Sequence, residues 1–475
     1  MATSIHGLST FLKRRRNCSG GQATGERVIQ TSRYRFGRQV AGSLLGALAL
    51  LLTCSPGTSL AATVTATSCS FADVKSALDR ASNGDTVLVP PGTCTWTSSM
   101  DFDLAIANGT NKYLTLQGAG IDQTIIIDGV SKAPYPNIAH LIRWTTVSGG
   151  LTRITGFTFQ GGTSVDSYNQ GMVYIRGKSQ LFRFDHNKVI PTRTSGMMMW
   201  GNVVGVLDHN IFDVSQGWGL YTFHDSWGGV GGYGDNSWAS PSTLGTQQAI
   251  FIEDNLFTNN QSSGYHRYAV DGWSGGRVVY RNNIFNNCTW ANHGTESSGR
   301  HRSQRQFEIY NNSWTWDMKG NNFASMIGAR GGVGVVFNNT ATITNGSVNN
   351  FFDISYYRAS QPFSPWGQCP SAWDQSSTSC LDQTGKGQGN LISGDSPSPA
   401  VWPNQVTDPT YVWNNTINGS ASPAASHAPT VVVIGRDLMN QVRPGYAPYA
   451  YPHPLVTSTG ATNPPPAPPQ NVTVR

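Results

Sequence analysis

The sequence predicts an all-β protein built as a parallel β-helix, a solenoid of stacked coils. The first observation is a repeated pattern in which a hydrophobic segment ends in a polar residue followed by Asn. An internal period between 20 and 50 residues is typical of solenoids, whose stacked repeats share one core. The closing asparagines, separated by 23, 45, 28, 29 and 27 residues, are Asn187, Asn210, Asn255, Asn283, Asn312 and Asn339.

Composition supports the same fold class. The 475 residues include 53 Gly, and only 12% are charged, which disfavours a protein of long helices. Many short β-type runs separated by Gly and Asn are typical of all-β chains. The net charge of +6 is concentrated partly in the N-terminal region, so it does not point to nucleic acid or any other partner.

The N-terminal region, residues 1–61, is interpreted as an export signal. Basic residues up to Arg38 precede an apolar stretch at 41–53, which is too short to span a bilayer. Ser59-Leu60-Ala61 then provides a small-residue cleavage site. Cys54 lies in a loose lipoprotein-like context, so lipidation stays open. We expect a secreted, periplasmic or cell-surface protein with no membrane span.

Five cysteines follow the predicted signal. An oxidising compartment favours disulfides, and we expect Cys69 to pair with Cys94 and Cys369 with Cys380. Cys288 is then left as a buried free thiol.

The remaining elements follow in order along residues 62–358, the predicted β-helix. Residues 70–83 form an amphipathic helix that covers the open end of the coil stack. Residues 359–455 lack the repeat and are expected to be an irregular segment packed on the coils. Residues 456–475 are a Pro-rich tail. Strands are expected at 85–90, 112–118, 123–129, 140–146 and 151–159, before the Asn repeats.

The segment GDTVLVPPGTCTW at 84–96 and the strand–Asn repeats resemble the pectate-lyase-like right-handed parallel β-helix superfamily over about residues 70 to 355. The resemblance implies a right-handed coil. That superfamily contains lyases, hydrolases, esterases and phage tailspikes, so the function must be argued from the site. Its lyases typically use Arg or Lys as the base, often with Ca²⁺ on acidic groups.

A second series of strands suggests where the site lies. When these strands are aligned on their last residues, strand alternation predicts that residues such as Val270 and Phe223 face the core. Because neighbouring coils are about 4.8 Å apart, His224, Asp271 and His293 are expected side by side on the outer face. The full outward column is Arg176, Trp200, His224, Asp271, His293 and Gly328.

Two inserted loops flank this column, and inserted loops on a rigid scaffold often carry binding sites. Loop 226–245 is predicted to form an aromatic wall with Trp227, Tyr233 and Trp238. Loop 294–304 and the residue that follows it are predicted to form a basic wall with Arg300, Arg302 and Arg305.

The pattern favours an exported polysaccharide lyase that cleaves a uronate-containing glycan by β-elimination. His293 is the candidate base, with Arg300 or Arg302 as substitutes. Asp271 orients His293 or holds a cation, and His224 is the candidate acid. Arg300, Arg302 and Arg305 are expected to neutralise the substrate carboxylate. Ca²⁺ is a candidate cofactor. The candidate metal ligands are Asp225, Asp271 and Glu296, and the candidate substrate-binding residues are Arg305, Arg176, Trp200, Trp227, Tyr233, Trp238, His266, Arg267 and Arg330.

Two alternatives stay open. A glycoside hydrolase of polygalacturonase-like layout would use Asp225 and Asp271 as its carboxylate pair, supported by His293 and Arg330. The full sequence signatures of that class are absent. A non-catalytic glycan-binding surface protein would use the same groove. In each case the partner is an acidic polysaccharide and the protein is expected to be a monomer.

Overall fold

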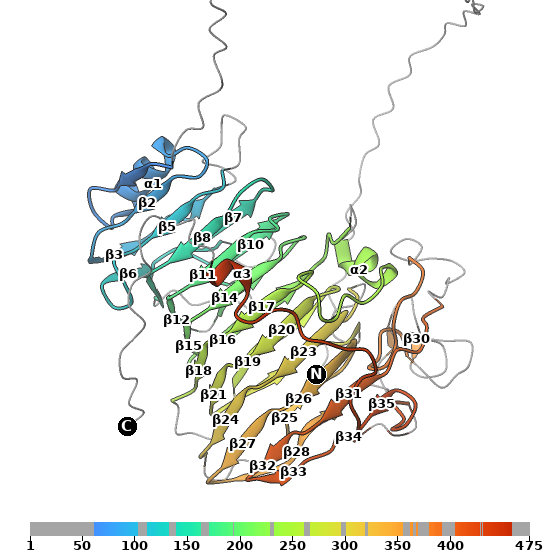
Figure 1. Ribbon diagram of the computed structural model, residues 1–475. Helices are drawn as coiled ribbons and strands as arrows, with labels where there is room; N and C mark the ends of the chain where they lie inside the picture. Colours follow the sequence, from blue (N-terminus) through green and yellow to red (C-terminus); the bar gives the residue numbers. More distant parts are fainter. Residues whose placement is uncertain are drawn as a thin grey trace, which may run out of the picture. The chain divides into compact units, whose positions relative to one another are not determined.

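The computed structural model confirms an all-β fold with three long parallel sheets, as a parallel β-helix requires (Figure 1). From β2 to β28 each coil contributes one strand to each sheet, so neighbours in a sheet are three strands apart in the chain. The structure describes residues 61–102, 112–132, 139–162, 171–192, 194–228, 232–260, 267–295, 301–318, 322–354, 362–363, 367–368, 380–391, 404–427, 429 and 431–457.

The bounds of the strands, taken sheet by sheet, are as follows. The twelve-stranded sheet contains β1 (Thr63–Thr65), β2 (Thr86–Leu88), β5 (Thr115–Gln117), β8 (Thr152–Thr155), β11 (Phe182–Asp185), β14 (Gly205–Asp208), β17 (Ile250–Glu253), β20 (Arg277–Arg281), β23 (Gln306–Tyr310), β26 (Val333–Phe337), β31 (Thr410–Trp413) and β35 (Leu438–Met439). The ten-stranded sheet contains β4 (Met100–Asp101), β7 (Ile142–Thr146), β10 (Val173–Gly177), β13 (Ser195–Met199), β16 (Trp218–Phe223), β19 (Arg267–Trp273), β22 (Cys288–Ala291), β25 (Asn322–Gly328), β28 (Ser347–Ile354) and β34 (Ala425–Ser426). The eleven-stranded sheet contains β3 (Gly92–Trp96), β6 (Thr124–Asp128), β9 (Thr158–Gly161), β12 (Lys188–Ile190), β15 (Ile211–Asp213), β18 (Leu256–Thr258), β21 (Ile284–Asn286), β24 (Ser313–Trp316), β27 (Thr340–Ile343), β32 (Thr416–Ile417) and β33 (Ser420–Ala421).

Short elements lie outside these ladders. They are α1 (Phe71–Arg80), the 3-10 turn η1 (Gly232–Gly234), α2 (Asp235–Ala239), the antiparallel pair β29 (Pro362–Phe363) and β30 (Gly367–Gln368), and α3 (Pro454–Thr457). None of the described helices is long and apolar enough to cross a membrane.

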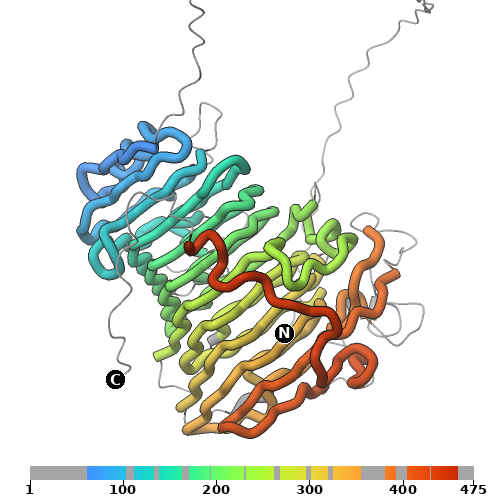
Figure 2. Tube along the Cα trace, in the orientation of Figure 1, coloured from blue at the N-terminus to red at the C-terminus, as the bar shows by residue number. Residues whose placement is uncertain are grey.

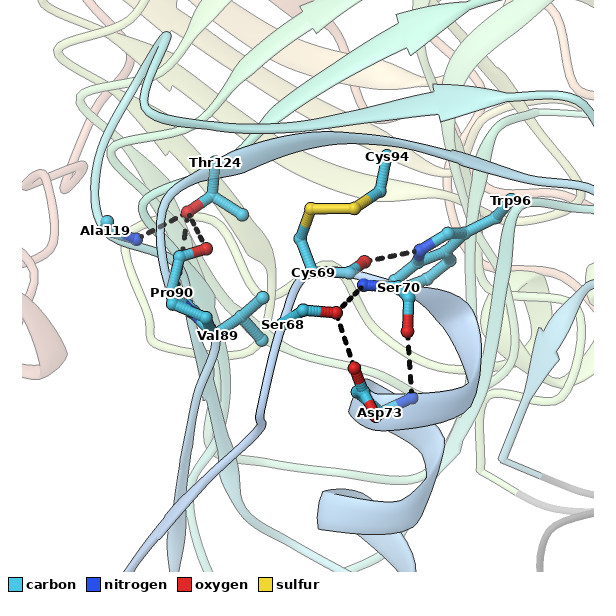
Figure 3. The surroundings of a disulfide bond; sticks show 10 residues. All are labelled: Ser68, Cys69, Ser70, Asp73, Val89, Pro90, Cys94, Trp96, Ala119 and Thr124. Atoms are coloured by element: carbon cyan, nitrogen blue, oxygen red, sulfur yellow. Dashed lines mark hydrogen bonds between the residues drawn. A yellow bond between two sulfur atoms is a disulfide. The ribbon is translucent and has the colours of Figure 1, made fainter.

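The predicted N-terminal helix is present as α1. The Ser70 hydroxyl accepts a hydrogen bond from the backbone N–H of Asp73, which satisfies a free donor of the first turn. Cys69 is disulfide-bonded to Cys94, as predicted, and the indole N–H of Trp96 donates to the Cys69 carbonyl (Figure 3). The disulfide therefore fixes the start of α1 to β3.

The other cysteines also agree with the predictions, as far as the structure describes them. Cys380 is disulfide-bonded, while its predicted partner Cys369 lies outside the described residues. Cys288 is a buried free thiol, and burial raises its pKa well above the usual range, so it stays neutral.

The asparagine ladder forms one corner of the coils. The Oδ1 atom of Asn283 accepts a hydrogen bond from the Asn255 backbone N–H at 3.0 Å, and its Nδ2 donates to the Ile252 carbonyl at 2.8 Å. The same arrangement recurs from Asn187 to Asn339. The residue before each ladder Asn has a positive φ, as in His186 and His209, which explains why His, Asp and Asn occupy these corners.

Replacing Asn283 with alanine is expected to destabilise the fold by about 2 kcal/mol, because the buried backbone N–H of Asn255 loses its acceptor. Asn349→Ala, at an exposed position of β28, is the matched control and should have little effect. Urea unfolding measures both. An equal midpoint for the two variants would contradict the role of the ladder.

The sheets continue beyond residue 358, where the sequence predicted an irregular segment. Strands β31, β32 and β34 extend the three sheets. Asn415 adds one more position to the ladder, since its Oδ1 accepts from the Asn339 backbone N–H at 3.1 Å. The prediction was wrong for residues 410–426 because the long separation concealed this repeat.

Residues 443–457, the C-terminal strap, do pack over the coils. The strap crosses the outer face of the twelve-stranded sheet (dark red in Figure 2), where Tyr446 and Leu455 cover apolar residues of the sheet. The Arg281 guanidinium donates to the carbonyls of Tyr449 and Ala450, each at 2.7 Å. The strap thus closes this face with both apolar contacts and hydrogen bonds.

The strap also covers a buried carboxyl group, which leads to a pH prediction. Burial raises the pKa of Glu308 to about 7 from 4.5, although the Tyr446 hydroxyl and the Gly245 N–H donate to it. The folded state therefore keeps a proton that the unfolded state releases, so Glu308 should destabilise the protein as pH rises from 4.5 to 7.

Glu308→Gln removes this ionisation and keeps a hydrogen-bond acceptor. The variant is expected to gain on the order of 3 kcal/mol over the wild type at pH 8 and nothing at pH 4. Thermal melting at the two pH values measures the difference. A gain of equal size at pH 4 and pH 8 would show that ionisation of Glu308 is not the cause.

Candidate active site

The outer face of the ten-stranded sheet carries a row of aromatic side chains on successive coils. We call the residues Tyr174, Trp200, Tyr221, Phe223 and Trp273 the aromatic platform. Strand alternation explains the row, because the residues between them point into the core, as Ile175 and Met199 do. The register confirms the stacking order, since Tyr174 pairs with Met198, and Phe223 with Trp273.

The rings of the platform contact one another directly. The Trp200 indole stacks on Phe223 with ring centroids 4.0 Å apart, and Trp273 meets Phe223 edge to face at 4.9 Å. Phe223 is fully buried beneath its neighbours, whereas Trp200 and Trp273 are half-buried. The two indoles are therefore the parts of the platform that a ligand can touch.

An aspartate–histidine pair stands at the end of the platform. Oδ2 of Asp271 lies 2.6 Å from Nδ1 of His293, and this Nδ1 makes no linear hydrogen bond to a described residue. The Asp271 Oδ1 accepts from the Gly272 N–H at 2.7 Å, and the His293 ring packs edge to face on Trp273 at 4.5 Å. Asp271 is buried and the His293 side chain is 21% exposed. Because Nδ1 is buried, Nε2 is the ring nitrogen that can reach a ligand.

Arg330 lies on the coil next to His293. Strands β22 and β25 pair Trp290 with Ile327 and Ala291 with Gly328, and continuing this register sets Arg330 beside His293, about 4.8 Å along the stack. The backbone N–H of Arg330 donates to the Asn292 side chain at 2.7 Å. A half-buried arginine therefore follows on the coil next to the Asp271–His293 pair.

The predicted outward column is only partly correct. Arg176, Trp200 and His293 do occupy one column, but Phe223 and Trp273 take the places assigned to His224 and Asp271. The strands end at different points relative to the sheet, so alignment on their polar ends shifted the register. Asp271 belongs to the neighbouring outward column, beside Tyr221.

His224 is corrected from a candidate acid to a structural residue. Its side chain is fully buried, with Nε2 2.8 Å from the Val203 carbonyl and Nδ1 accepting the Arg277 backbone N–H at 2.9 Å. Burial lowers its pKa to about 4, so the ring stays neutral. Both nitrogens are engaged, so His224 is not available to a substrate.

The predicted basic wall is also buried. Arg302 is fully buried and forms two hydrogen bonds with Asp382, each at 2.7 Å, and one with Asp235 at 3.1 Å. Arg305 is fully buried as well, and burial lowers its pKa to about 10. Both guanidinium groups lie against the Trp238 ring at 5.3 and 5.1 Å, so they stabilise the fold rather than face a polysaccharide.

The three residues of the predicted aromatic wall lie in different surroundings. Trp238 is buried and its indole N–H donates to the Ser303 carbonyl, while Trp227 is covered by the Arg277 guanidinium at 4.4 Å. Tyr233 is half-buried and contacts the ring of His301 at 4.9 Å. Of the three predicted aromatic residues, Tyr233 is the one that remains near the platform.

The other predicted residues lie at the margin of the site or outside the described part. Arg176 is exposed on the coil before Trp200. Asp225 is half-buried, accepts the Gly201 N–H at 2.7 Å, and has its pKa raised by burial. His266, Glu296 and Arg300 lie outside the described residues, and Arg267 is described by its backbone alone.

The predicted calcium site stays a prediction, because Glu296, one of its three candidate ligands, lies outside the described residues. Ca²⁺ takes six to eight oxygen ligands, whereas Asp225 and Asp271 are not grouped with a third ligating residue among those described. One oxygen of Asp271 is bound by the Gly272 N–H and the other contacts His293. We therefore derive no step through a metal at this position.

One described cluster has the spacing of metal ligands, namely Asp185, His186 and Asp208. Arg153 donates two hydrogen bonds to Asp185, and Arg183 donates two to Asp208. Each carboxylate is already neutralised by a guanidinium group, which fits a structural role for these corner residues rather than metal binding.

The sequence analysis missed two features of the site. Phe223 is the last residue of β16, Trp273 is the last residue of β19, and Trp200 directly follows β13. This recurrence of aromatic residues at strand ends is the signal that could have indicated the platform. His301 lies in the inserted loop 294–304, and the sequence analysis assigns it no role. Its Nδ1 lies 2.6 Å from the Ser274 hydroxyl, a contact that no sequence pattern indicates.

Comparisons with known proteins do not assign a family. No protein-family model matches the chain, and no curated protein matches it. Among solved structures, ORF18 of Geobacillus virus E2 is 16% identical with a TM-score of 0.29 over 68% of this chain, and this chain spans 64% of that protein. An alginate lyase from Paenibacillus sp. str. FPU-7 is 14% identical with a TM-score of 0.25, covering 60% of this chain and 95% of the lyase. The catalytic domain of a GH87 α-1,3-glucanase in complex with nigerose is 11% identical with a TM-score of 0.26, covering 80% and 68%. With TM-scores below 0.5, none of them indicates an activity for this chain.

Proposed function

We propose that the protein is an exported polysaccharide lyase that cleaves a uronate-containing glycan by β-elimination, as expected for a pectate-lyase-like β-helix. The observation that carries the proposal is the Asp271–His293 contact of 2.6 Å at the end of the aromatic platform. It combines a candidate base, a group that orients it and a stacking surface. The disulfide between Cys69 and Cys94 is compatible with export.

His293 takes the role of base in this proposal. Asp271 holds the Nδ1 side of the imidazole, so Nε2 faces the substrate and removes the proton next to the uronate carboxylate. Asp271 also stabilises the imidazolium that forms. This arrangement differs from the Arg or Lys base that the family resemblance implies.

Arg330 takes the role that the sequence analysis gave to Arg302. Removing a proton beside a carboxylate spreads negative charge onto that carboxylate, and a nearby cation stabilises it. A guanidinium group can do so with two parallel hydrogen bonds. Arg330 is one coil from His293, which is a suitable distance for binding the carboxylate of the sugar that reacts.

The aromatic platform then binds neighbouring sugar units. Indole faces stack well on the apolar faces of sugar rings, and Trp200 and Trp273 are the half-buried members of the platform. Arg176, exposed beyond Trp200, would pair with another uronate further along the chain. The substrate therefore runs along the coil stack.

A glycoside hydrolase remains the second candidate because burial raises the pKa of Asp225, as a general acid requires. The Asp225–Asp271 pair would then do the chemistry, and the reaction would need no proton removal from carbon.

Product analysis on a panel of uronate glycans separates these functions. A lyase generates unsaturated uronate ends, detected by ultraviolet absorbance, in equal number to new reducing ends. A hydrolase generates reducing ends alone, and a binding protein generates neither. Asp225→Asn should leave substantial lyase turnover, whereas loss of all cleavage in this variant with no unsaturated product would favour the hydrolase.

A further inference from the structure

We infer that the protein holds a small monovalent anion, of which chloride is the type, in a closed site at the turn 240–243, where the guanidinium group of Arg305 binds it. The inference goes beyond the proposed reaction and does not depend on it. It starts from a buried positive charge that the surrounding residues do not neutralise.

Arg305 is a fully buried cation with too few hydrogen-bond partners. Its Nη2 donates to the Ser240 carbonyl at 3.1 Å. Its Nε and Nη1 are also buried, and they form no hydrogen bond with any residue that the structure describes. Every nitrogen of a guanidinium group is a donor, and a buried donor needs an acceptor. These two nitrogens therefore call for an acceptor that the described part of the chain does not supply.

A second buried arginine lies close to Arg305 and has no carboxylate partner of its own. Burial, together with repulsion from Arg305, lowers the pKa of Arg277 well below its usual value. The hydrogen-bond acceptors of the Arg277 guanidinium are neutral oxygens of four described residues, namely Ser237, Pro241, Thr243 and Gln306. Two like charges are thus enclosed together, which is costly unless a negative group neutralises them.

The nearby carboxylates do not provide that negative charge. Asp382 and Asp408 attract the Arg305 charge, but each already has a partner. Asp382 accepts from Arg302 at 2.7 Å, and Asp408 accepts from Arg443 at 2.8 Å. The described group has four guanidinium groups and three carboxylates, namely Arg277, Arg302, Arg305, Arg443, Asp235, Asp382 and Asp408. One positive charge is left over, which a monovalent anion balances.

The surroundings of Arg305 favour a small ion. The fully buried Trp238 ring lies 5.1 Å from the guanidinium, and the Gly389 N–H donates to the Trp238 carbonyl at 3.1 Å. Gln306, the next residue along the chain, is fully buried and its Nε2 is a further donor with no hydrogen bond to a described residue. Its Oε1 accepts from the Thr243 N–H at 2.7 Å, which fixes the direction of the amide.

These features distinguish between classes of anion. Chloride and bromide carry one charge and accept from several N–H donors at once. Sulfate is larger and carries two charges, and gluconate is too large for an enclosed site. An anion at Arg305 would hold the turn 240–243 against the sheet, because Arg305 and Gln306 bind the two ends of that turn.

Anion exchange in solution tests the inference without any polysaccharide. At constant ionic strength, replacing gluconate with chloride should raise the melting temperature of the wild type by on the order of 2 °C for each tenfold of chloride above its Kd. Arg305→Met removes the charge at similar side-chain length and should lose this response. Arg80→Met, at an exposed position of α1, is the matched control for general effects of salt and should respond as the wild type does.

Bromide locates the ion directly. Crystals of protein prepared throughout in bromide should show an anomalous-scattering peak within hydrogen-bond distance of Nε or Nη1 of Arg305. This measurement keeps the inference testable if Arg305→Met fails to fold. Three results would each overturn it: a wild-type melting temperature that is the same in chloride and gluconate, an equal chloride response in Arg305→Met, or bromide peaks only away from Arg305. None of them bears on the proposed lyase activity.

Discussion

Replacing His293 with alanine is expected to lower kcat/KM on an acidic polysaccharide by about 10² to 10⁴-fold, with KM nearly unchanged. This is the range for removing a positioned proton-transfer residue. His293 is 21% exposed, and its ring contacts Asp271 and Trp273 rather than the core. The loss should therefore be in the chemical step and not in folding.

Two companion variants sharpen this result. Asp271→Asn should lower kcat less than His293→Ala, because the imidazole remains but loses its charged partner. His209→Ala, on another face of the coils, should leave the rate unchanged. Circular dichroism should match the wild type for all three, and the melting temperatures of His293→Ala and Asp271→Asn should match it as well. Full activity of His293→Ala together with an inactive Asp225→Asn would exclude the proposed base.

Replacing Arg302 with methionine is expected to destabilise the protein by about 3 to 5 kcal/mol, the usual cost of leaving one partner of a buried ion pair unpaired. Asp382, which accepts two hydrogen bonds from Arg302, is fully buried. Asp235 would also lose its contact with this guanidinium. The variant should unfold at a lower urea concentration and show lower activity only through that loss.

Arg176→Met is the matched comparison, because Arg176 is an exposed arginine of the proposed glycan path. It should raise KM for the polysaccharide and leave the unfolding midpoint unchanged. If Arg302→Met raised KM with an unchanged midpoint, Arg302 would bind substrate, as the sequence alone suggested, and the buried pairing would be contradicted.

Local chemistry explains what could be predicted from the sequence. The asparagine ladder repeats because each corner needs a residue that tolerates a positive φ, followed by an amide that bonds to the next coil. These requirements are met within a few residues, so they are visible in the sequence. Helix α1 was predictable for the same reason, whereas the Cys69–Cys94 disulfide was predictable from the export signal.

Long-range packing explains what could not be predicted. The sequence alone suggests that Arg302 is a surface cation, because its partner Asp382 lies 80 residues further along the chain. The sequence alone suggests that Trp238 is exposed, but in the structure the guanidinium groups of Arg302 and Arg305 cover its ring. The predicted outward column that contained His224 was wrong because strand ends vary by one or two residues between coils. A shift of one residue turns a side chain from the outer face to the core, as at His224, whereas a shift of two moves it to the neighbouring outward column, as at Asp271.

The most direct test is a crystal structure of the His293→Ala variant with a uronate oligosaccharide bound. We expect sugar rings on the indoles of Trp200 and Trp273, the carboxylate of one unit at Arg330, and C5 of that unit facing the space left by the imidazole. An oligosaccharide bound away from the ten-stranded sheet, or with no carboxylate near Arg330, would contradict the proposed site.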